Sequence, residues 1–133
     1  MLACMDAAQA IADLTEISPQ VRHVVVIGAD GSLQGSNLAD TEAAQRLLEG
    51  ARKLVDTAEG LRPGVAQLEA ATPGGSVFVV RDGDRLIAAT TTPEPTVGLV
   101  FYDLKTCIRS IEDTPKPARR RPPAKKKAED AAS

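Results

Sequence analysis

Val21-Arg-His-Val-Val-Val-Ile-Gly-Ala-Asp-Gly31 is the stretch of the sequence that decides the fold. Within it, Val24–Ile27 is an unbroken run of branched apolar side chains, which is typical of a strand covered on both faces of a sheet. The Asp-Gly pair at 30–31 favours the positive backbone angles of a tight hairpin turn. The stretch therefore predicts a strand over 21–27 in the middle of a sheet, with a short return strand over Leu33–Ser36.

Three other segments repeat apolar residues at the spacing of a helix. Residues 6–17 do so until Ser18-Pro19, where proline cannot continue the hydrogen-bond ladder. A long helix is predicted from Asp40 to Gly60, and a third from Val97 to Ile111, after the prolines at 93 and 95. The apolar stripe of the long helix consists of Ala44, Leu47, Leu48, Ala51, Leu54, Val55 and Ala58.

The segment between the second and third helices predicts three more strands. Residues 65–71 alternate between polar and apolar side chains, as a half-exposed strand does. Residues 76–80 and 86–91 are more apolar, and turn residues at 73–75 and 82–84 separate the three strands. The order α-β-β-α-β-β-β-α predicts the α+β class, with a central five-stranded antiparallel sheet flanked by three helices.

The half-polar strand 65–71 is expected at an edge of this sheet. Val65, Gln67 and Glu69 share one of its faces. Unpaired backbone groups at an edge attract a partner strand, and a second copy of the chain, related by a two-fold axis, can supply one. We therefore expect a homodimer with Val65, Gln67 and Glu69 at its contact edge.

The charge of the chain divides after residue 113. Residues 1–113 contain nine Lys/Arg and sixteen Asp/Glu, whereas residues 114–133 contain seven Lys/Arg, two acidic residues and four prolines. We predict one acidic folded domain over 1–113 and a disordered basic tail over 114–133. The tail either keeps the chain soluble or tethers it to nucleic acid or an anionic membrane through Arg119, Arg120, Arg121, Lys125, Lys126 and Lys127.

The composition argues against several classes of protein. The apolar runs are strand-sized, far short of the roughly 20 residues that span a bilayer. One tyrosine and two phenylalanines offer little stacking surface for single-stranded nucleic acid. Cys4 and Cys107 form no metal or disulfide pattern, so a reducing cytoplasm fits best, and Cys107 is interpreted as a core residue. The helical pattern is complete without residues 1–4, so either Met1 or Met5 can be the start.

The sequence contains no pattern for catalysis. A phosphate loop ending in Lys-Ser/Thr is absent, so the chain is not expected to be a GTPase itself. Residues 28–31 and 73–75 can be interpreted as anion cradles, but as hairpin turns they need no ligand. His23 is a lone imidazole in a strand, and Asp82 and Asp84 lie in a turn. We expect no catalytic residue, no cofactor and no metal site.

Three stretches together resemble the Roadblock/LC7 family, over roughly residues 5–112. They are the strand and turn of 21–31, the hairpin Gly75-Ser-Val-Phe-Val-Val-Arg-Asp-Gly-Asp-Arg-Leu-Ile-Ala-Ala-Thr-Thr-Thr-Pro93, and the helix start Val97-Gly-Leu-Val-Phe-Tyr102. The resemblance implies a profilin-like layer architecture and dimers formed through the long helix and a sheet edge. Gly98 costs about 1 kcal/mol relative to Ala inside a helix, so we expect a close backbone approach there. The small, polar residues of 33–36 depart from the family pattern.

The resemblance also implies a role as a regulator that binds a Ras-like small GTPase or an associated signalling protein. A pure dimerisation scaffold and a tether acting through the tail remain alternatives. The exposed face of the long helix can dock such a partner, although a solvated face has the same composition. Its candidate residues are Arg46, Glu49, Arg52, Lys53 and Asp56.

Overall fold

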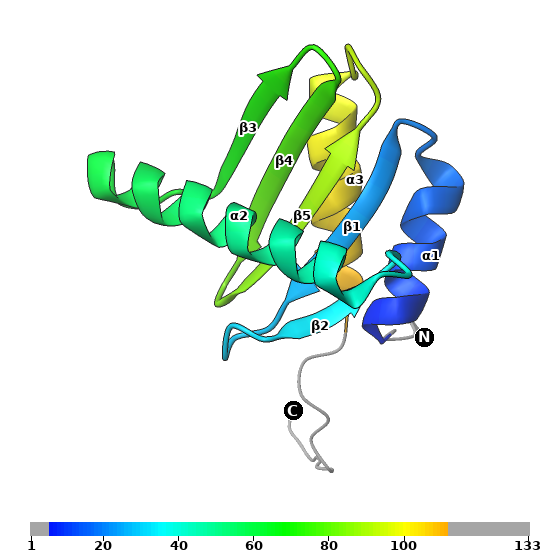
Figure 1. The fold of residues 1–133 in the computed structure, drawn as a ribbon, viewed down its shortest axis with the longest axis horizontal. Coiled ribbons are helices and arrows are strands. Elements are labelled where there is room, and N and C mark those ends of the chain that lie inside the picture. The colour runs from blue at the N-terminus through cyan, green and yellow to red at the C-terminus, as the bar shows by residue number, and fades with distance from the viewer. Residues whose placement is uncertain (1–5, 112–133) are drawn as a thin grey trace, which may run out of the picture.

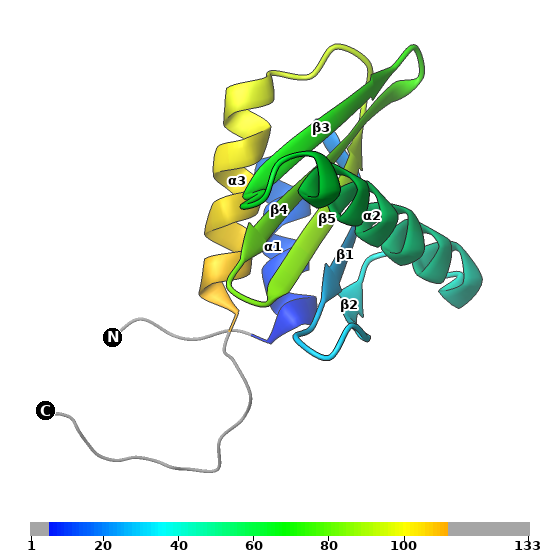
Figure 2. The same cartoon turned by 90° about the vertical axis from the view of Figure 1, so that its left-hand side faces the viewer.

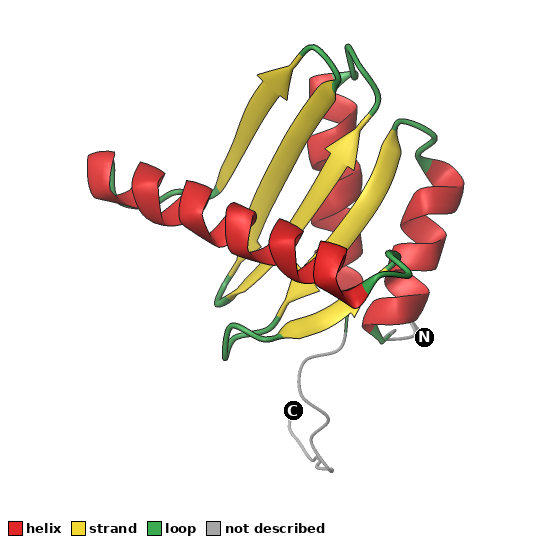
Figure 3. Cartoon of the chain, in the orientation of Figure 1, coloured by secondary structure: helices red, strands yellow, loops and turns green. Residues whose placement is uncertain are grey.

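The computed structural model describes residues 6–111, which form three helices and one five-stranded antiparallel sheet (Figure 1). The elements are α1 (Ala7–Ile17), β1 (Val21–Ile27), β2 (Leu33–Ser36), α2 (Thr41–Leu61), β3 (Gln67–Thr72), β4 (Gly75–Asp82), β5 (Arg85–Thr91) and α3 (Val97–Ser110). Figure 3 separates them by type. The predicted fold class and element order are confirmed. None of the helices within 6–111 is long and apolar enough to cross a bilayer.

The strands lie in the order β2-β1-β5-β4-β3. β1 is an inner strand, and Val24, Val25 and Val26 are completely buried. The expectation that it lies in the middle of the sheet is wrong by one place, because β5 is the middle strand and β1 pairs with both β5 and β2. β3 is an edge strand, as expected, although it begins at Gln67 and not at residue 65.

The three helices cover the two faces of the sheet unequally. α1 and α3 pack side by side on one face, and α2 crosses the other face alone (Figure 2). The alternation of β1 supplies both cores, because Val24 and Val26 pack toward α1 and α3 whereas Val25 packs toward α2. The first core contains an edge-to-face pair, Phe78 and Phe101, with ring centroids 4.9 Å apart.

Side chains and turns define the helix ends that the sequence predicted. The carboxylate of Asp6 accepts the N–H of Gln9, and that of Asp40 accepts the N–H of Glu42. The start of α3 has no side-chain cap of its own. Instead, the N–H of Thr96 donates to the side-chain carbonyl of Gln20 in the turn between α1 and β1. This bond holds the end of α1 against the start of α3.

The small residues of β2 have a packing reason. A Cβ placed on Gly35 would lie 2.7 Å from the Cβ of Ala7 and 3.3 Å from Cδ1 of Ile11. α1 therefore passes close over this strand, and only glycine fits beneath it. At Gly35, the departure from the expected pattern follows from this contact between a helix and an edge strand.

The expectation for Gly98 is wrong within the described part of the chain. A Cβ placed on Gly98 has no described atom within 4 Å, so no close backbone approach explains this glycine. Gly98 lies in the first turn of α3, on exposed surface. The structure offers no packing reason for a glycine at this position.

Alanine substitutions at these two glycines should therefore have different effects on the free energy of unfolding. Gly35→Ala is expected to lower the free energy of unfolding by about 1–3 kcal/mol, because the new methyl group overlaps Ala7. Gly98→Ala is expected to leave it unchanged or raise it by up to about 1 kcal/mol, because alanine is the better helix former. Urea unfolding followed by circular dichroism measures both. Equal effects of the two substitutions would contradict this account of the α1–β2 contact.

Candidate protein-binding site

An apolar groove lies between α2 and the β3 edge of the sheet. Only Ala44, Leu48, Ala51 and Val55 of the predicted stripe of α2 are buried. Leu47, Leu54 and Ala58 instead line a cavity of about 670 Å³, together with Leu61 and the β-strand residues Leu68, Ala70 and Val77. Leu61 is the most exposed large apolar residue within 6–111, at 81%. The groove is the part of the α2 stripe that residues 6–111 do not cover.

The edge strand borders this groove. β3 pairs with β4 from Gln67 opposite Val80 to Thr72 opposite Gly75. Gln67 and Glu69 are exposed on β3, and the groove is lined by Glu69. Of the three residues predicted for a dimer edge, Gln67 and Glu69 therefore lie on the edge strand, whereas Val65 lies in the loop before it.

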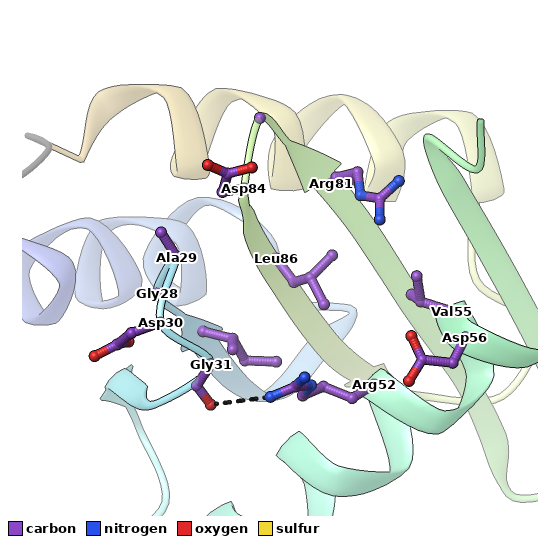
Figure 4. A pocket seen from close by; sticks show the side chains of 12 residues that line it. Gly28, Ala29, Asp30, Gly31, Arg52, Val55, Asp56, Arg81, Asp84 and Leu86 are labelled. Atoms are coloured by element: carbon purple, nitrogen blue, oxygen red, sulfur yellow. Dashed lines mark hydrogen bonds between the residues drawn. The ribbon is translucent and has the colours of Figure 1, made fainter. Parts of the chain in front are cut away.

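A second, polar cavity of about 490 Å³ lies on the other side of α2 (Figure 4). Its apolar lining comes from Ile27, Val55 and Leu86, and its charged lining comes from Asp30, Arg52, Asp56, Arg81 and Asp84. Arg52 points at the β1–β2 turn, where its Nη1 donates to the carbonyl oxygen of Gly31 over 3.5 Å. Guanidinium and carboxylate groups both surround the opening. Because positive and negative charges are present together, the cavity favours neither anions nor cations.

The five residues predicted on the exposed face of α2 divide between these two sides. Arg46 and Lys53 border the apolar groove. Arg52 and Asp56 border the polar cavity, and Glu49 lies on the outer surface between them. Residues 28–31 form the hairpin turn that the sequence predicted, in which the carboxylate of Asp30 accepts hydrogen bonds from the hydroxyl and the N–H of Ser32. These bonds lower the pKa of Asp30, and the bond from the Ser32 hydroxyl has the larger effect.

Cys107 and His23 are the remaining residue types that could carry chemistry. Cys107 is buried between α1 and α3, where its thiol donates to the carbonyl oxygen of Ala10 over 3.5 Å. Burial, with a smaller effect of the Asp13 charge, raises the pKa of this thiol to about 12, so it is not a nucleophile near neutral pH. His23 is exposed on β1. Within residues 6–111, no three His, Cys, Asp or Glu residues are grouped to hold a metal ion.

Solved structures with this arrangement carry the Roadblock/LC7 description. A Roadblock/LC7 domain from Streptomyces avermitilis matches with a TM-score of 0.69 at 18% identity, covering 80% of this chain and 94% of that one. The gliding protein MglB from Thermus thermophilus matches with a TM-score of 0.59 at 15% identity, covering 79% and 84%. The protein has the Roadblock/LC7 fold. LokiProfilin2, in complex with rabbit actin, matches with a TM-score of 0.56 at 14% identity, covering 76% and 91%.

The likeness is one of fold and not of sequence. No family model matches the chain, and no curated protein sequence is similar to it. The matches span most of the length of each Roadblock/LC7 structure, and the layers agree with the profilin-like architecture that the sequence predicted.

One carboxylate of this Roadblock/LC7 fold holds the edge strand against α2. Glu59, near the end of α2, accepts the N–H of Gly64 over 2.8 Å and that of Val65 over 3.1 Å. Arg81 of β4 lies 3.4 Å from the same carboxylate and donates to the carbonyl oxygen of Val65. These contacts lower the pKa of Glu59. The bond from Gly64 has the largest effect, followed by the bond from Val65 and then by Arg81. Sequence periodicity does not reveal this residue, because its partners lie in a loop.

Substitution of Glu59 should have a pH-dependent effect on stability. Because the folded state lowers the pKa of Glu59, its charged form stabilises the fold above the ordinary value of 4.5, and this contribution is lost as the pH falls through the lowered pKa. Glu59→Gln is expected to lower the Tm at about pH 7 and to have little effect at about pH 3. Glu49→Gln, on the outer surface of α2, is the matched control and should change neither. An equal loss of Tm at both pH values would contradict the role of the charge.

Proposed function

We propose that this protein is a non-catalytic, cytoplasmic regulatory module that forms a homodimer and binds a Ras-like small GTPase or a signalling protein associated with one. The observation that carries the proposal is the apolar groove that the described residues leave uncovered, beside a strand edge with no pairing strand among them. Large exposed apolar patches on soluble domains mark interaction sites, of which protein–protein contacts are one kind. The likeness in fold to Roadblock/LC7 domains supports the same class of function.

The dimer is proposed to form through α2 and β3. A two-fold axis beside β3 pairs this edge with its copy and places one α2 over the groove of the other protomer. Leu47, Leu54 and Leu61 then leave water together with Leu68 of the partner chain, which is the main source of stability in such a contact. Arg46 and Lys53 on α2 and Glu69 on β3 border the groove with opposite charges, which suits self-complementary contact.

A charge in the groove should separate the protomers without unfolding them. Leu54→Glu places a carboxylate among half-buried apolar side chains at the proposed contact, so we expect a monomer with an unchanged circular dichroism spectrum. Gln45→Glu adds the same charge on the exposed side of α2 and is expected to leave the dimer intact. Sedimentation velocity at about 10 μM measures both, together with the unaltered protein. An unaltered protein that sediments as a monomer would remove the proposed dimer.

The GTPase or its associate is proposed to bind the charged surface of α2 that faces away from the groove. Glu49, Arg52 and Asp56 remain accessible there once the groove is occupied, and the guanidinium of Arg52 donates one long hydrogen bond to the carbonyl oxygen of Gly31. An exposed guanidinium beside carboxylates gives a partner groups of both signs to pair with. The GTPase itself is inferred from the family resemblance.

Binding to the Ras-like GTPase encoded nearest the gene tests this part of the proposal. Arg52→Glu is expected to weaken the Kd about tenfold, because it reverses a contact charge. Arg109→Glu on α3, on the opposite face of the sheet, is the matched control and should bind as the unaltered protein does. Calorimetry gives the affinities, and hydrolysis and nucleotide-exchange rates give the effect on the GTPase. Binding with no change in either rate would favour a pure scaffold, and no binding would contradict the proposed partner.

The division into a domain over 1–113 and a tail over 114–133 stays a proposal, since residues 112–133 lie outside the described part. The six basic residues predicted to act electrostatically all fall there. Neither the described residues nor the similar structures support nucleic-acid or membrane binding by this segment. The regulatory proposal does not depend on it.

A further inference from the structure

The outer edge of β3 has a hydrogen-bonding pattern that restricts how a second strand can pair with it. The backbone N–H of Arg81 on β4 donates to the carbonyl oxygen of Ala66, at the start of the β3–β4 ladder. Because hydrogen-bonded and non-hydrogen-bonded pairs alternate along an antiparallel ladder, Leu68 and Ala70 also direct their backbone groups toward β4. The residues between them direct their N–H and C=O groups outward, and these are Gln67, Glu69 and Ala71.

The run of free outward groups ends on both sides of residues 67–71. No other strand within residues 6–111 pairs with this side of β3. The next outward position before the run is Val65, whose N–H already donates to Glu59 and whose carbonyl oxygen already accepts from Arg81. The next outward position after the run is Pro73, which has no N–H. The free edge is therefore a short unit with Glu69 at its centre.

We propose that the homodimer pairs β3 with its copy in one register, with Glu69 of each protomer directly opposite Glu69 of the other. This inference rests on the proposed dimer and specifies how its two edge strands meet. In an antiparallel pair related by a two-fold axis, the outward groups of one strand must face the outward groups of the other. With the axis at Glu69, Gln67 of each protomer lies opposite Ala71 of the other, and every free outward group gains a partner.

Registers displaced by one residue leave backbone groups unpaired. An axis one residue earlier places Ala71 opposite Val65, whose groups are already bonded within its own chain. An axis one residue later places Gln67 opposite Pro73, which cannot donate. Backbone groups that lose water at a contact without gaining a partner weaken it. The bonds of Glu59 and Arg81 to the loop thus help to select the register.

The like charges at the axis are kept apart by a contact within each protomer. The hydroxyl of Ser76 on β4 donates to Oε2 of Glu69 over 3.1 Å. Since β4 lies on the inner side of β3, this bond draws the carboxylate away from the free edge. Like charges directly opposite weaken a strand pair, and this displacement reduces that effect.

The same register joins the two apolar grooves. Leu68 and Ala70 face α2, because their partners on β4, Val79 and Val77, pack in the core beneath that helix. With the axis at Glu69, Leu68 of each protomer lies opposite Ala70 of the other. A large side chain then meets a small one on both sides of the axis. Each groove is completed by a leucine of the second copy.

A cysteine on the axis meets its own copy, so the position that cross-links by itself identifies the axis. In a Cys4→Ser background, the only other thiol is the buried Cys107. Directly opposed residues lie about 5.5 Å apart at Cα, which a disulfide spans, whereas diagonal neighbours lie about 7–8 Å apart. Under mild oxidation, Glu69→Cys should therefore give about tenfold more disulfide dimer on a non-reducing gel than Leu68→Cys or Ala70→Cys.

A mixed pair tests the register with both Glu69 carboxylates in place. The Gln67→Cys and Ala71→Cys proteins are expected to cross-link when mixed and to give little disulfide dimer separately, because these two residues face each other across the axis. Cross-linking of Glu69→Cys without this mixed cross-link would show that loss of the charge had moved the strands. That result would overturn the proposal.

Sedimentation velocity of the unaltered protein separates this inference from the proposed function. A monomer would remove the dimer and the register with it. If the protein is a dimer, the register is overturned when Leu68→Cys or Ala70→Cys cross-links best, or when no position from 67 to 71 cross-links. The dimer itself would stand in either case.

Discussion

The structure depends on covering a five-stranded sheet with three helices, two on one face and one on the other. Five strands spaced by about 4.8 Å make a sheet about 24 Å wide, whereas a helix with its side chains is about 10–12 Å across. α1 and α3 together cover their face, and the buried side chains of β1, β4 and β5 there form the larger core. α2 alone cannot cover the other face. Its buried stripe reaches β1 and β5, and the part beside β3 becomes the apolar groove.

The length of α2 has a second consequence. The helix crosses the sheet and continues beyond the β3 edge (Figure 1), so the chain must turn back through residues 62–66 to begin β3. Backbone groups in such a loop have no ladder to satisfy them. The carboxylate of Glu59 accepts two of the loop N–H groups, and Arg81 donates to the carbonyl oxygen of Val65. These bonds join α2, the loop and β4. The loop that leads into the edge strand is thus held in position, and no other strand of residues 6–111 pairs with the outer side of β3.

The sequence predicted the parts of this molecule that have a period. Helices and strands follow from spacings of three to four and of two, and the Asp-Gly and Gly-Gly turns follow from backbone angles that few residues adopt. Contacts between elements have no period. The overlap that makes Gly35 necessary depends on where α1 crosses β2, and the bonds of Glu59 depend on where the loop after α2 returns. Gly98 misled the sequence argument, because a helical glycine can mark a close approach or nothing structural at all.

The candidate site, too, depends on contacts between elements that a sequence period does not reveal. Periodicity put seven apolar residues on one stripe of α2 and five charged residues opposite, but it could not tell which of the apolar residues would find cover. The position of α2 over the sheet leaves Leu48 and Val55 buried and Leu47 and Leu54 in the groove. The same position divides the charged residues, since Arg46 and Lys53 border the groove and Arg52 and Asp56 border the polar cavity.

The two contact surfaces proposed on α2 rely on different forces. The α2–β3 groove is mainly apolar, so a contact there should persist at high salt, whereas a contact at Glu49, Arg52 and Asp56 relies on charges that salt screens. Because these three charged residues lie away from the groove, a dimer formed through α2 and β3 would leave them accessible in both protomers. A rise in ionic strength would then weaken the binding of the partner without separating the protomers.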